Sequence, residues 1–437
     1  METRRVRQAL PVALIAASAF LAACGTGQAP QSTAAPAPAA AATPAPAPAA
    51  RPAPATASTQ APANAQTEFV APNPIKFEDA VTRAGRQLFR DAQATLGPEA
   101  RLMVIDPLID ANTGGQTVST AKMGDDLEAL SRKEFRSYAV SPLTRNTLAT
   151  KPLLLIGTLT PVNVERSIDK QPDAFRVWLT LIDLRTGKVV AKALDRATVD
   201  SVNSEPLPFY RDSPTWHKDA TVMGYINSCQ VNTKIGDLAD PDYLKRLPAA
   251  AVINEAILAY DDGKVAPANR LYKEAQPIAD PGDLRVLNGL YITNWQLGKK
   301  DEAKDAFGKL VASGLELKRL PMKLLFQPGR TTFVSSGDLP VQYQVWMASL
   351  AQEAARTNSC VRVVGHTSRT GSARANEALS KQRAEAVQKM LEKDNRALAS
   401  RLSSTGSGSR EALVGLGTDD ARDALDRRVE FRVVDCV

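Results

Sequence analysis

Apolar residues recur every three or four positions along residues 77–96, which predicts an amphipathic helix there. Residues 102–105 form a short apolar run that stops at Asp106-Pro107, and this pattern predicts a buried strand. The same patterns alternate further along the chain and predict a helix over 123–135 and strands over 152–159, 175–183 and 189–191. Helix, strand, helix and then several strands indicate an α/β sandwich, which we assign to residues 68–217.

The pattern is helical over residues 218–319, and part of it repeats. Three pairs of positions share an offset of 35 residues, namely Gly263/Gly298, Ala268/Ala303 and Tyr272/Phe307. This segment resembles tetratricopeptide repeats, which are packed helix pairs with a period of about 34 residues. Because about three repeats are usually needed for independent stability, we expect this TPR-like segment to be a connector that packs against a neighbouring domain.

Specific motifs appear in the last part of the chain. A predicted strand at 361–364 runs into Gly365-His366-Thr367-Ser368, and the helical pattern of Asn376-Glu377-Ala378-Leu379-Ser380 through Arg383 to Val387 follows. Arg427-Arg428-Val429-Glu430-Phe431 reads as a final strand. In this order the elements resemble an OmpA-like domain over residues 320–437. The whole chain is then a multidomain α/β protein with an N-terminal α/β sandwich, a central TPR-like helical segment and a C-terminal βαβαβ-type sandwich.

The OmpA-like resemblance implies noncovalent binding of peptidoglycan through the zwitterionic end of a diaminopimelate stem peptide. In that family an aspartate ends the GHTD loop, and an arginine fifteen residues later pairs with the ligand carboxylate. Arg383 matches the arginine, but Ser368 stands where the family has the aspartate. A hydroxyl accepts a hydrogen bond from an ammonium group without supplying a charge, so we expect weaker binding at Ser368.

The candidate ligand-binding residues that the resemblance implies are Thr367, Ser368, Asn376, Arg383, Asp426, Arg427 and Arg428. Asp426 replaces the family's asparagine before the paired arginines. Its carboxylate either restores the missing charge in the groove or pairs with Arg427 or Arg428. For Asn376 the alternative is a helix cap. His366 is expected to be a structural loop histidine, because no second histidine or cysteine adjoins it.

The N-terminus has the features of an export signal. Arg4, Arg5 and Arg7 precede an apolar stretch that ends in Leu21-Ala22-Ala23-Cys24. This resembles a bacterial lipoprotein signal, which implies removal of the signal peptide 1–23, acylation of Cys24 with palmitate-like chains and attachment to the outer membrane, facing the periplasm. Residues 29–66 contain 18 Ala and 9 Pro, so we read 24–67 as the lipidated cysteine followed by a disordered tether.

Two further cysteines are placed to form a disulfide. Cys360 opens the strand before the GHT loop, and Cys436 follows the last strand. If these strands are antiparallel neighbours, the start of one meets the end of the other, and an exported compartment permits the bond. Cys229 is left over and is either buried or paired between molecules.

Composition excludes several function classes. The net charge of +7 is small and dispersed, which does not indicate a nucleic-acid binder. Two histidines and four cysteines leave little material for a metal site or a histidine-based catalytic system, so we expect no metal, no cofactor and no enzymatic activity.

Residues 68–217 show a weaker resemblance to the periplasmic domains of LpoB, CsgG and the TolB N-terminus, in which such domains bind other envelope proteins. The sequence as a whole is therefore interpreted as an outer-membrane lipoprotein that binds the cell wall and links envelope layers. The alternative is an envelope regulator or assembly factor, such as an activator of a cell-wall synthase or a secretion component. In that case the OmpA-like pocket has altered or lost its peptidoglycan binding.

Overall fold

A computed structural model describes residues 72–97, 99–138, 140–163, 165, 170–230, 232–418, 420 and 423–436. The predicted signal peptide 1–23, the lipidated Cys24 and the whole of the tether 24–67 lie outside the described residues, as do residues 68–71. Glu68–Val437 forms one compact unit. Among the residues described, no helix combines the length and the apolar character that a membrane span requires.

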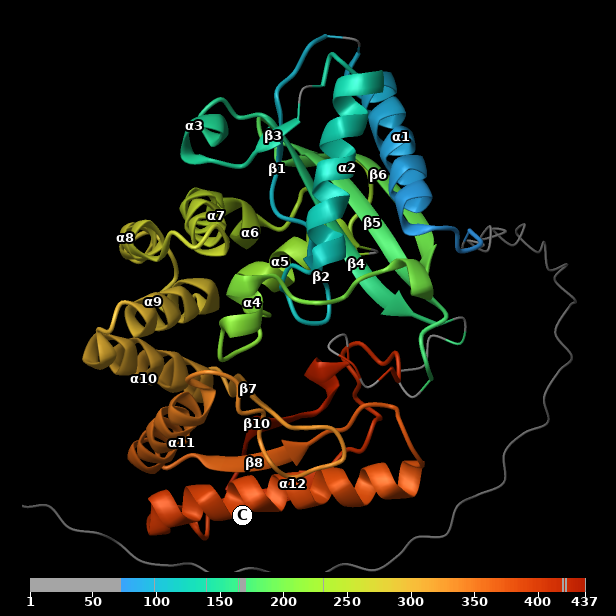
Figure 1. Ribbon diagram of the computed structural model, residues 1–437. Coiled ribbons are helices and arrows are strands. Elements are labelled where there is room, and N and C mark those ends of the chain that lie inside the picture. The colour runs from blue at the N-terminus through green and yellow to red at the C-terminus, as the bar shows by residue number, and fades with distance from the viewer. Residues whose placement is uncertain are drawn as a thin grey trace, which may run out of the picture. The chain divides into compact units, whose positions relative to one another are not determined.

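The N-terminal α/β sandwich is built on a six-stranded sheet. Its strand order is β3-β1-β4-β5-β6, and β2 pairs with β4. The strands are β1 (Met103–Ile105), β2 (Ile109–Asp110), β3 (Val140–Pro142), β4 (Leu153–Val162), β5 (Ala174–Asp183) and β6 (Lys188–Thr198). Helices α1 (Phe77–Leu96) and α2 (Val118–Glu134) cover one face of this sheet (Figure 1). The apolar stripe of α1 predicted from the sequence is buried in the core beneath it.

A second helical layer covers the other face. It consists of α5 (Ala220–Cys229), α6 (Pro241–Lys245) and the start of α7 (Leu247–Asp261), which share a buried cluster with β4. The first eight residues of β4 are all buried, and such a strand needs cover on both faces. Helices α5 and α6, which follow the boundary predicted at residue 217, provide that cover on the second face. Cys229 is buried in this layer as a free thiol.

Helices α7, α8 (Val265–Ala275), α9 (Leu284–Gln296) and α10 (Lys300–Glu316) pack one after another. Gly289 on α9 admits the ring of Tyr272, since a Cβ at this glycine would lie 2.3 Å from that ring. Phe307 on α10 stacks on Trp346 of the following domain with ring centroids 5.8 Å apart. The helical segment thus shares its core with the next domain, and its likeness to tetratricopeptide repeats stays a prediction.

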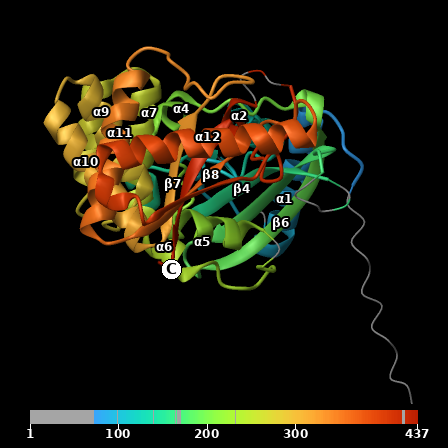
Figure 2. The ribbon, with the colours of Figure 1, turned by 90° about the horizontal axis from the view of Figure 1, so that it is seen from below.

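The C-terminal domain has a four-stranded sheet with strand order β7-β10-β8-β9. Its elements are β7 (Arg319–Leu325), α11 (Leu339–Arg356), β8 (Cys360–Gly365), α12 (Ala373–Asp394), β9 (Leu402–Gly406) and β10 (Arg428–Val434). Only β8 and β9 are parallel. Helix α12 runs along one face of the sheet and contacts β8 and β9 (Figure 2). Short helices complete the chain: α3 (Arg145–Leu148), α4 (Pro208–Asp212), η1 (Val199–Ser201), η2 (Arg396–Leu398) and η3 (Ala424–Asp426).

The C-terminal domain is joined to the sandwich by shared structure. Lys323 of β7 donates its backbone N–H to the carbonyl of Pro214 at 2.9 Å, and Thr215 forms a bridge with Met322. Three residues between β9 and β10, namely Val414, Leu416 and Leu425, are buried in the core of the α/β sandwich. This insertion explains why residues 68–437 form one unit.

A disulfide joins Cys360 to Cys436. The two strands concerned are antiparallel neighbours, and Cys360 lies opposite Val434 in their register. The start of β8 therefore meets the end of β10, as the sequence order of the cysteines requires. A crosslink of this length restricts the unfolded chain and stabilises a fold by about 2–4 kcal/mol.

Candidate functional site

The GHT loop leaves the end of β8 and is fixed by its backbone. His366 donates its N–H to the carbonyl of Arg428 at 2.8 Å, and Thr367 donates to Gly408 at 2.9 Å. Gly365 packs so tightly on α12 that a Cβ there would lie 1.9 Å from the carbonyl oxygen of Ser380. Only glycine fits at this crossing, which explains the first residue of the motif.

Asn376 clamps the GHT loop from α12. Its side-chain amide donates to the carbonyls of Ser368 at 3.3 Å and Thr370 at 3.1 Å. The helix cap is Ser372, whose hydroxyl accepts from the N–H of Ala375. The capping role considered for Asn376 therefore belongs to Ser372, and Asn376 fixes the shape of the loop.

Arg383 lies on the same face of α12, seven residues beyond Asn376. Its side chain is fully buried, and its guanidinium donates to the carbonyls of Arg330 at 2.9 Å, His366 at 2.9 Å and Gln327 at 3.0 Å. The guanidinium also lies 5.0 Å from the ring centroid of Phe326. One buried cation thus joins the GHT loop to the segment that follows β7.

Thr367 and Ser368 occupy the loop between these two clamps, and both are buried. The hydroxyl of Thr367 has no hydrogen-bond partner within the part of the chain that the structure describes. The structure thus brings four of the predicted residues together, with two hydroxyl side chains lying between an amide and a guanidinium.

Asp426 bonds to the backbone of the segment between β9 and β10, and its role in ligand binding stays a prediction. Its buried carboxylate accepts hydrogen bonds from the backbone N–H groups of Leu413 at 2.6 Å, Val414 at 3.1 Å and Gly415 at 2.7 Å. Burial raises the pKa of Asp426, and the nearby charge of Arg428 partly offsets this effect. Asp426 therefore anchors the segment that inserts into the sandwich.

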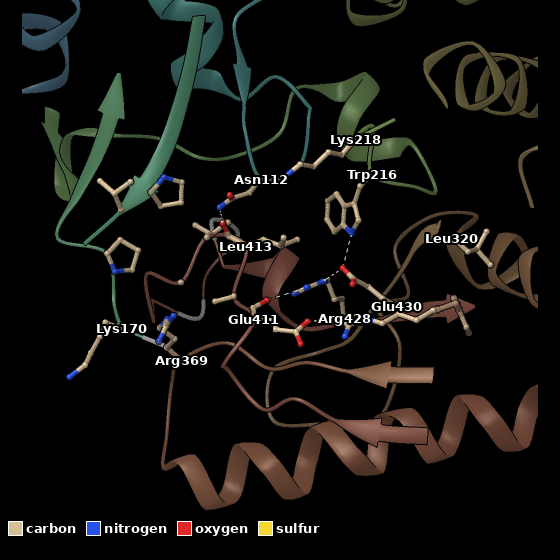
Figure 3. Close-up of a pocket in the computed structure, with 18 of the residues that line it drawn as sticks. Asn112, Lys170, Trp216, Lys218, Leu320, Arg369, Glu411, Leu413, Arg428 and Glu430 are labelled. Carbon is tan, nitrogen blue, oxygen red and sulfur yellow. Dashed lines mark hydrogen bonds and ion pairs between the residues drawn. The ribbon is translucent and has the colours of Figure 1, made fainter. Parts of the chain in front are cut away.

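The two arginines bond to residues around β10. Arg428 is buried and donates from Nε to Glu430 at 2.6 Å and from Nη2 to the carbonyl of Glu411 at 3.2 Å (Figure 3). Arg427 donates to the carbonyl of Asp420 at 3.5 Å. We conclude that Arg427 and Arg428 organise the turns around β10.

Residues 325–425 match the model of the OmpA family. The C-terminal part of the chain is an OmpA-like domain. The match covers the GHT loop, Asn376 and Arg383, and it ends immediately before Asp426. No curated protein matches the chain.

Several solved structures are similar to part of the chain. The peptidoglycan-associated lipoprotein of Burkholderia pseudomallei is 24% identical, with 26% of this chain and 89% of that chain covered and a TM-score of 0.23. The cell wall anchor of the T6SS from Pseudomonas aeruginosa is 20% identical over 29% and 95% of the two chains, with a TM-score of 0.22. The C-terminal domain of LpoB from Salmonella enterica is 11% identical over 28% and 98%, with a TM-score of 0.20. Scores this low do not extend the assignment beyond the OmpA-like domain.

The outer face of the OmpA-like sheet carries a polar network that the motifs did not indicate. Glu430 accepts hydrogen bonds from Arg428 and from the indole of Trp216, which comes from the sandwich, at 3.1 Å. Burial by itself raises the pKa of Glu430, but Arg428 outweighs it and lowers the pKa to about 2. The sequence of β10 contains a signal for this network. Charged residues alternate along the strand at Arg428, Glu430 and Arg432, and residues two apart in a strand share a face.

His366 is buried, with its Nε2 3.8 Å from Glu430. Burial, reinforced by the charge of Arg428, lowers the pKa of His366 well below its ordinary value, so the ring is neutral at pH 7. Within the described residues no group of three or more His, Cys, Asp or Glu side chains is arranged to hold a metal ion. The structural role predicted for His366 fits this position.

Proposed function

We propose that this protein binds peptidoglycan noncovalently through its OmpA-like domain and that lipidation of Cys24 attaches it to the outer membrane, so that it links two envelope layers. The observation that carries the proposal is the arrangement of the GHT loop, Asn376 and Arg383 within an OmpA-family match. Binding rather than turnover is the mechanism that we infer.

The stem peptide of peptidoglycan offers an ammonium group and a carboxylate. The Thr367 and Ser368 hydroxyls accept from the ammonium, and the positive charge of the buried Arg383 attracts the carboxylate across a poorly screening interior. Asn376 and Arg383 hold the loop carbonyls, so the loop needs little reorganisation on binding.

An altered pocket is the second candidate, and Ser368 is the observation that favours it. The OmpA-like site has no carboxylate from Asp426 to replace the family's aspartate, since that group bonds to residues 413–415. Under this alternative the domain takes part in regulation or assembly within the envelope, and the full-length chain fails to bind the wall.

Restoring the family's aspartate with Ser368→Asp should tighten binding to purified sacculi about tenfold, because a charge-assisted hydrogen bond replaces a neutral one and tenfold corresponds to ~1.4 kcal/mol. Cosedimentation of the full-length chain with sacculi measures the affinity. Lys389→Ala removes an exposed charge from α12 and is the matched control, expected to bind as wild type. If neither wild type nor Ser368→Asp sediments with sacculi, the wall-binding proposal is wrong and the altered pocket is favoured.

The anchoring half of the proposal has its own test. Cells that express the full-length chain and are fed a labelled fatty acid should incorporate the label, and Cys24→Ser should remove it entirely, because Cys24 carries the only thiol at the predicted cleavage site. Membrane fractionation should show the variant released from the outer membrane. Equal labelling of Cys24→Ser and wild type would refute lipidation at this cysteine.

A further inference from the structure

A cleft of about 770 Å³ lies between the end of the α/β sheet and the outer face of the OmpA-like sheet (Figure 3). One wall is formed by Pro161 and Val162 at the end of β4, and another by Trp216. The floor is formed by β10 and by residues 411–415. The α/β sandwich and the OmpA-like domain therefore both line the cleft. Its volume is typical of pockets that bind small molecules.

The cleft is strongly basic. Its lining contains six cationic side chains, namely Lys170, Lys218, Lys318, Arg369, Arg428 and Arg432, against the two carboxylates of Glu411 and Glu430. Both carboxylates are already engaged, because Glu430 accepts from Arg428 and Glu411 is paired with Arg432. The excess of positive charge over this small surface attracts an anion, and low-dielectric walls strengthen the attraction.

The floor of the cleft contains a buried cation with an unused donor. Arg428 is 2% exposed, and its Nη1 has no hydrogen-bond partner among the residues that the structure describes. A buried donor without a partner is costly and normally finds one. A ligand oxygen reaching the floor of the cleft would satisfy this guanidinium with a charge-assisted hydrogen bond.

The rim cations can change partners at little cost. Lys318 is paired with Asp435 at 3.3 Å, and both side chains are more than two-thirds exposed to solvent. Lys170 lies 3.7 Å from Glu165, and both of these side chains are more than half exposed. Exposed pairs of this kind contribute little to stability, so an incoming anion competes with them readily.

We propose that this cleft binds a compact ligand that carries two or more carboxylate or phosphate groups. One anionic group binds at Arg428, the others bind at the rim cations, and the apolar part of the ligand lies against Trp216 and Val162. Arg428 and Glu430 face away from the core that Val429 and Phe431 share with α12. The cleft adjoins the GHT loop, because Arg369, which follows Ser368, belongs to its lining.

The probes are tri-glutamate and inositol hexakisphosphate, titrated into the full-length chain by calorimetry at low and at physiological salt. We expect saturable one-to-one binding of at least one probe, weakened several-fold by the added salt. Whichever probe binds more tightly identifies carboxylates or phosphates as the preferred groups. The double variant Lys170→Ala/Lys218→Ala should weaken binding at least tenfold, and Lys389→Ala, on the opposite side of the OmpA-like sheet, should not.

Arg428→Lys tests whether the guanidinium at the floor of the cleft binds the ligand. This variant keeps the positive charge but loses the planar set of N–H donors. Circular dichroism and urea unfolding establish that this variant is folded, and it should lose affinity for the probe. Failure of both probes to bind, or binding that the Lys170→Ala/Lys218→Ala variant leaves unchanged, would overturn the proposal. Neither result affects wall binding, which Ser368→Asp tests separately.

Discussion

Replacing Arg383 with methionine should destabilise the folded chain by about 3–5 kcal/mol and abolish its retention on sacculi. The methionine fills much of the volume but leaves the carbonyls of Gln327, Arg330 and His366 buried without their donor. Each unsatisfied buried carbonyl costs about 1–3 kcal/mol, and the positive charge that attracts the ligand carboxylate is lost as well.

Urea unfolding of the full-length chain measures the first effect, and cosedimentation below the unfolding transition measures the second. Arg383→Lys keeps the charge but spans fewer carbonyls, so we expect about half the loss of stability and a partial loss of wall binding. Lys389→Ala, exposed on the same helix, should change neither property. A folded Arg383→Met variant that still sediments as wild type would show that Arg383 takes no part in ligand binding.

The OmpA-like domain could be predicted because its signals are local and ordered. Gly365 at the end of β8, Asn376 and Arg383 on α12 and the basic pair at the start of β10 each occupy a fixed place in one motif. The motif indicated the site residues but not their contacts. Asn376 and Arg383 hold backbone carbonyls, and these bonds depend on a loop conformation that side-chain patterns do not reveal.

The layers of the sandwich could be predicted only in part. The apolar stripe of α1 and the mostly apolar β4 indicated helix and strand correctly. The helical pattern of α5 indicates a buried helix equally well in a sandwich or in a repeat, so this pattern does not predict that α5 packs against β4. Whether α5 packs against the sandwich or against the helical segment depends on contacts between residues that are distant along the chain.

The insertion of three residues between β9 and β10 into the sandwich core was not predictable for the same reason. Val414, Leu416 and Leu425 are too irregularly spaced to indicate a helix or a strand, and they are buried because another domain covers them. The hydrogen bond from Asn112 to the carbonyl of Leu413, at 2.8 Å, joins residues 301 positions apart. Residues 411–415, which lead into this insertion, line the basic cleft.

Asp426→Ala should undock this insertion and destabilise the chain by about 3–5 kcal/mol, because the N–H groups of Leu413, Val414 and Gly415 lose their shared acceptor. Asp426→Asn should destabilise the chain less than Asp426→Ala, by about 2 kcal/mol. The asparagine carbonyl oxygen still accepts a hydrogen bond, but its NH₂ group faces backbone N–H donors and cannot accept from them. Hydrogen exchange at these three amides measures the local effect directly, and urea unfolding measures the total.

The matched control is Asp394→Asn at the exposed end of α12, which should stay within about 0.5 kcal/mol of wild type. Because residues 411–415 line the basic cleft, Asp426→Ala should also lose affinity for the polyanion probe. The GHT loop, in contrast, is held by Asn376 and Arg383, so wall binding should persist in the folded variant. Unchanged exchange at Leu413, Val414 and Gly415 would mean that the sandwich, and not the carboxylate of Asp426, holds the insertion in place.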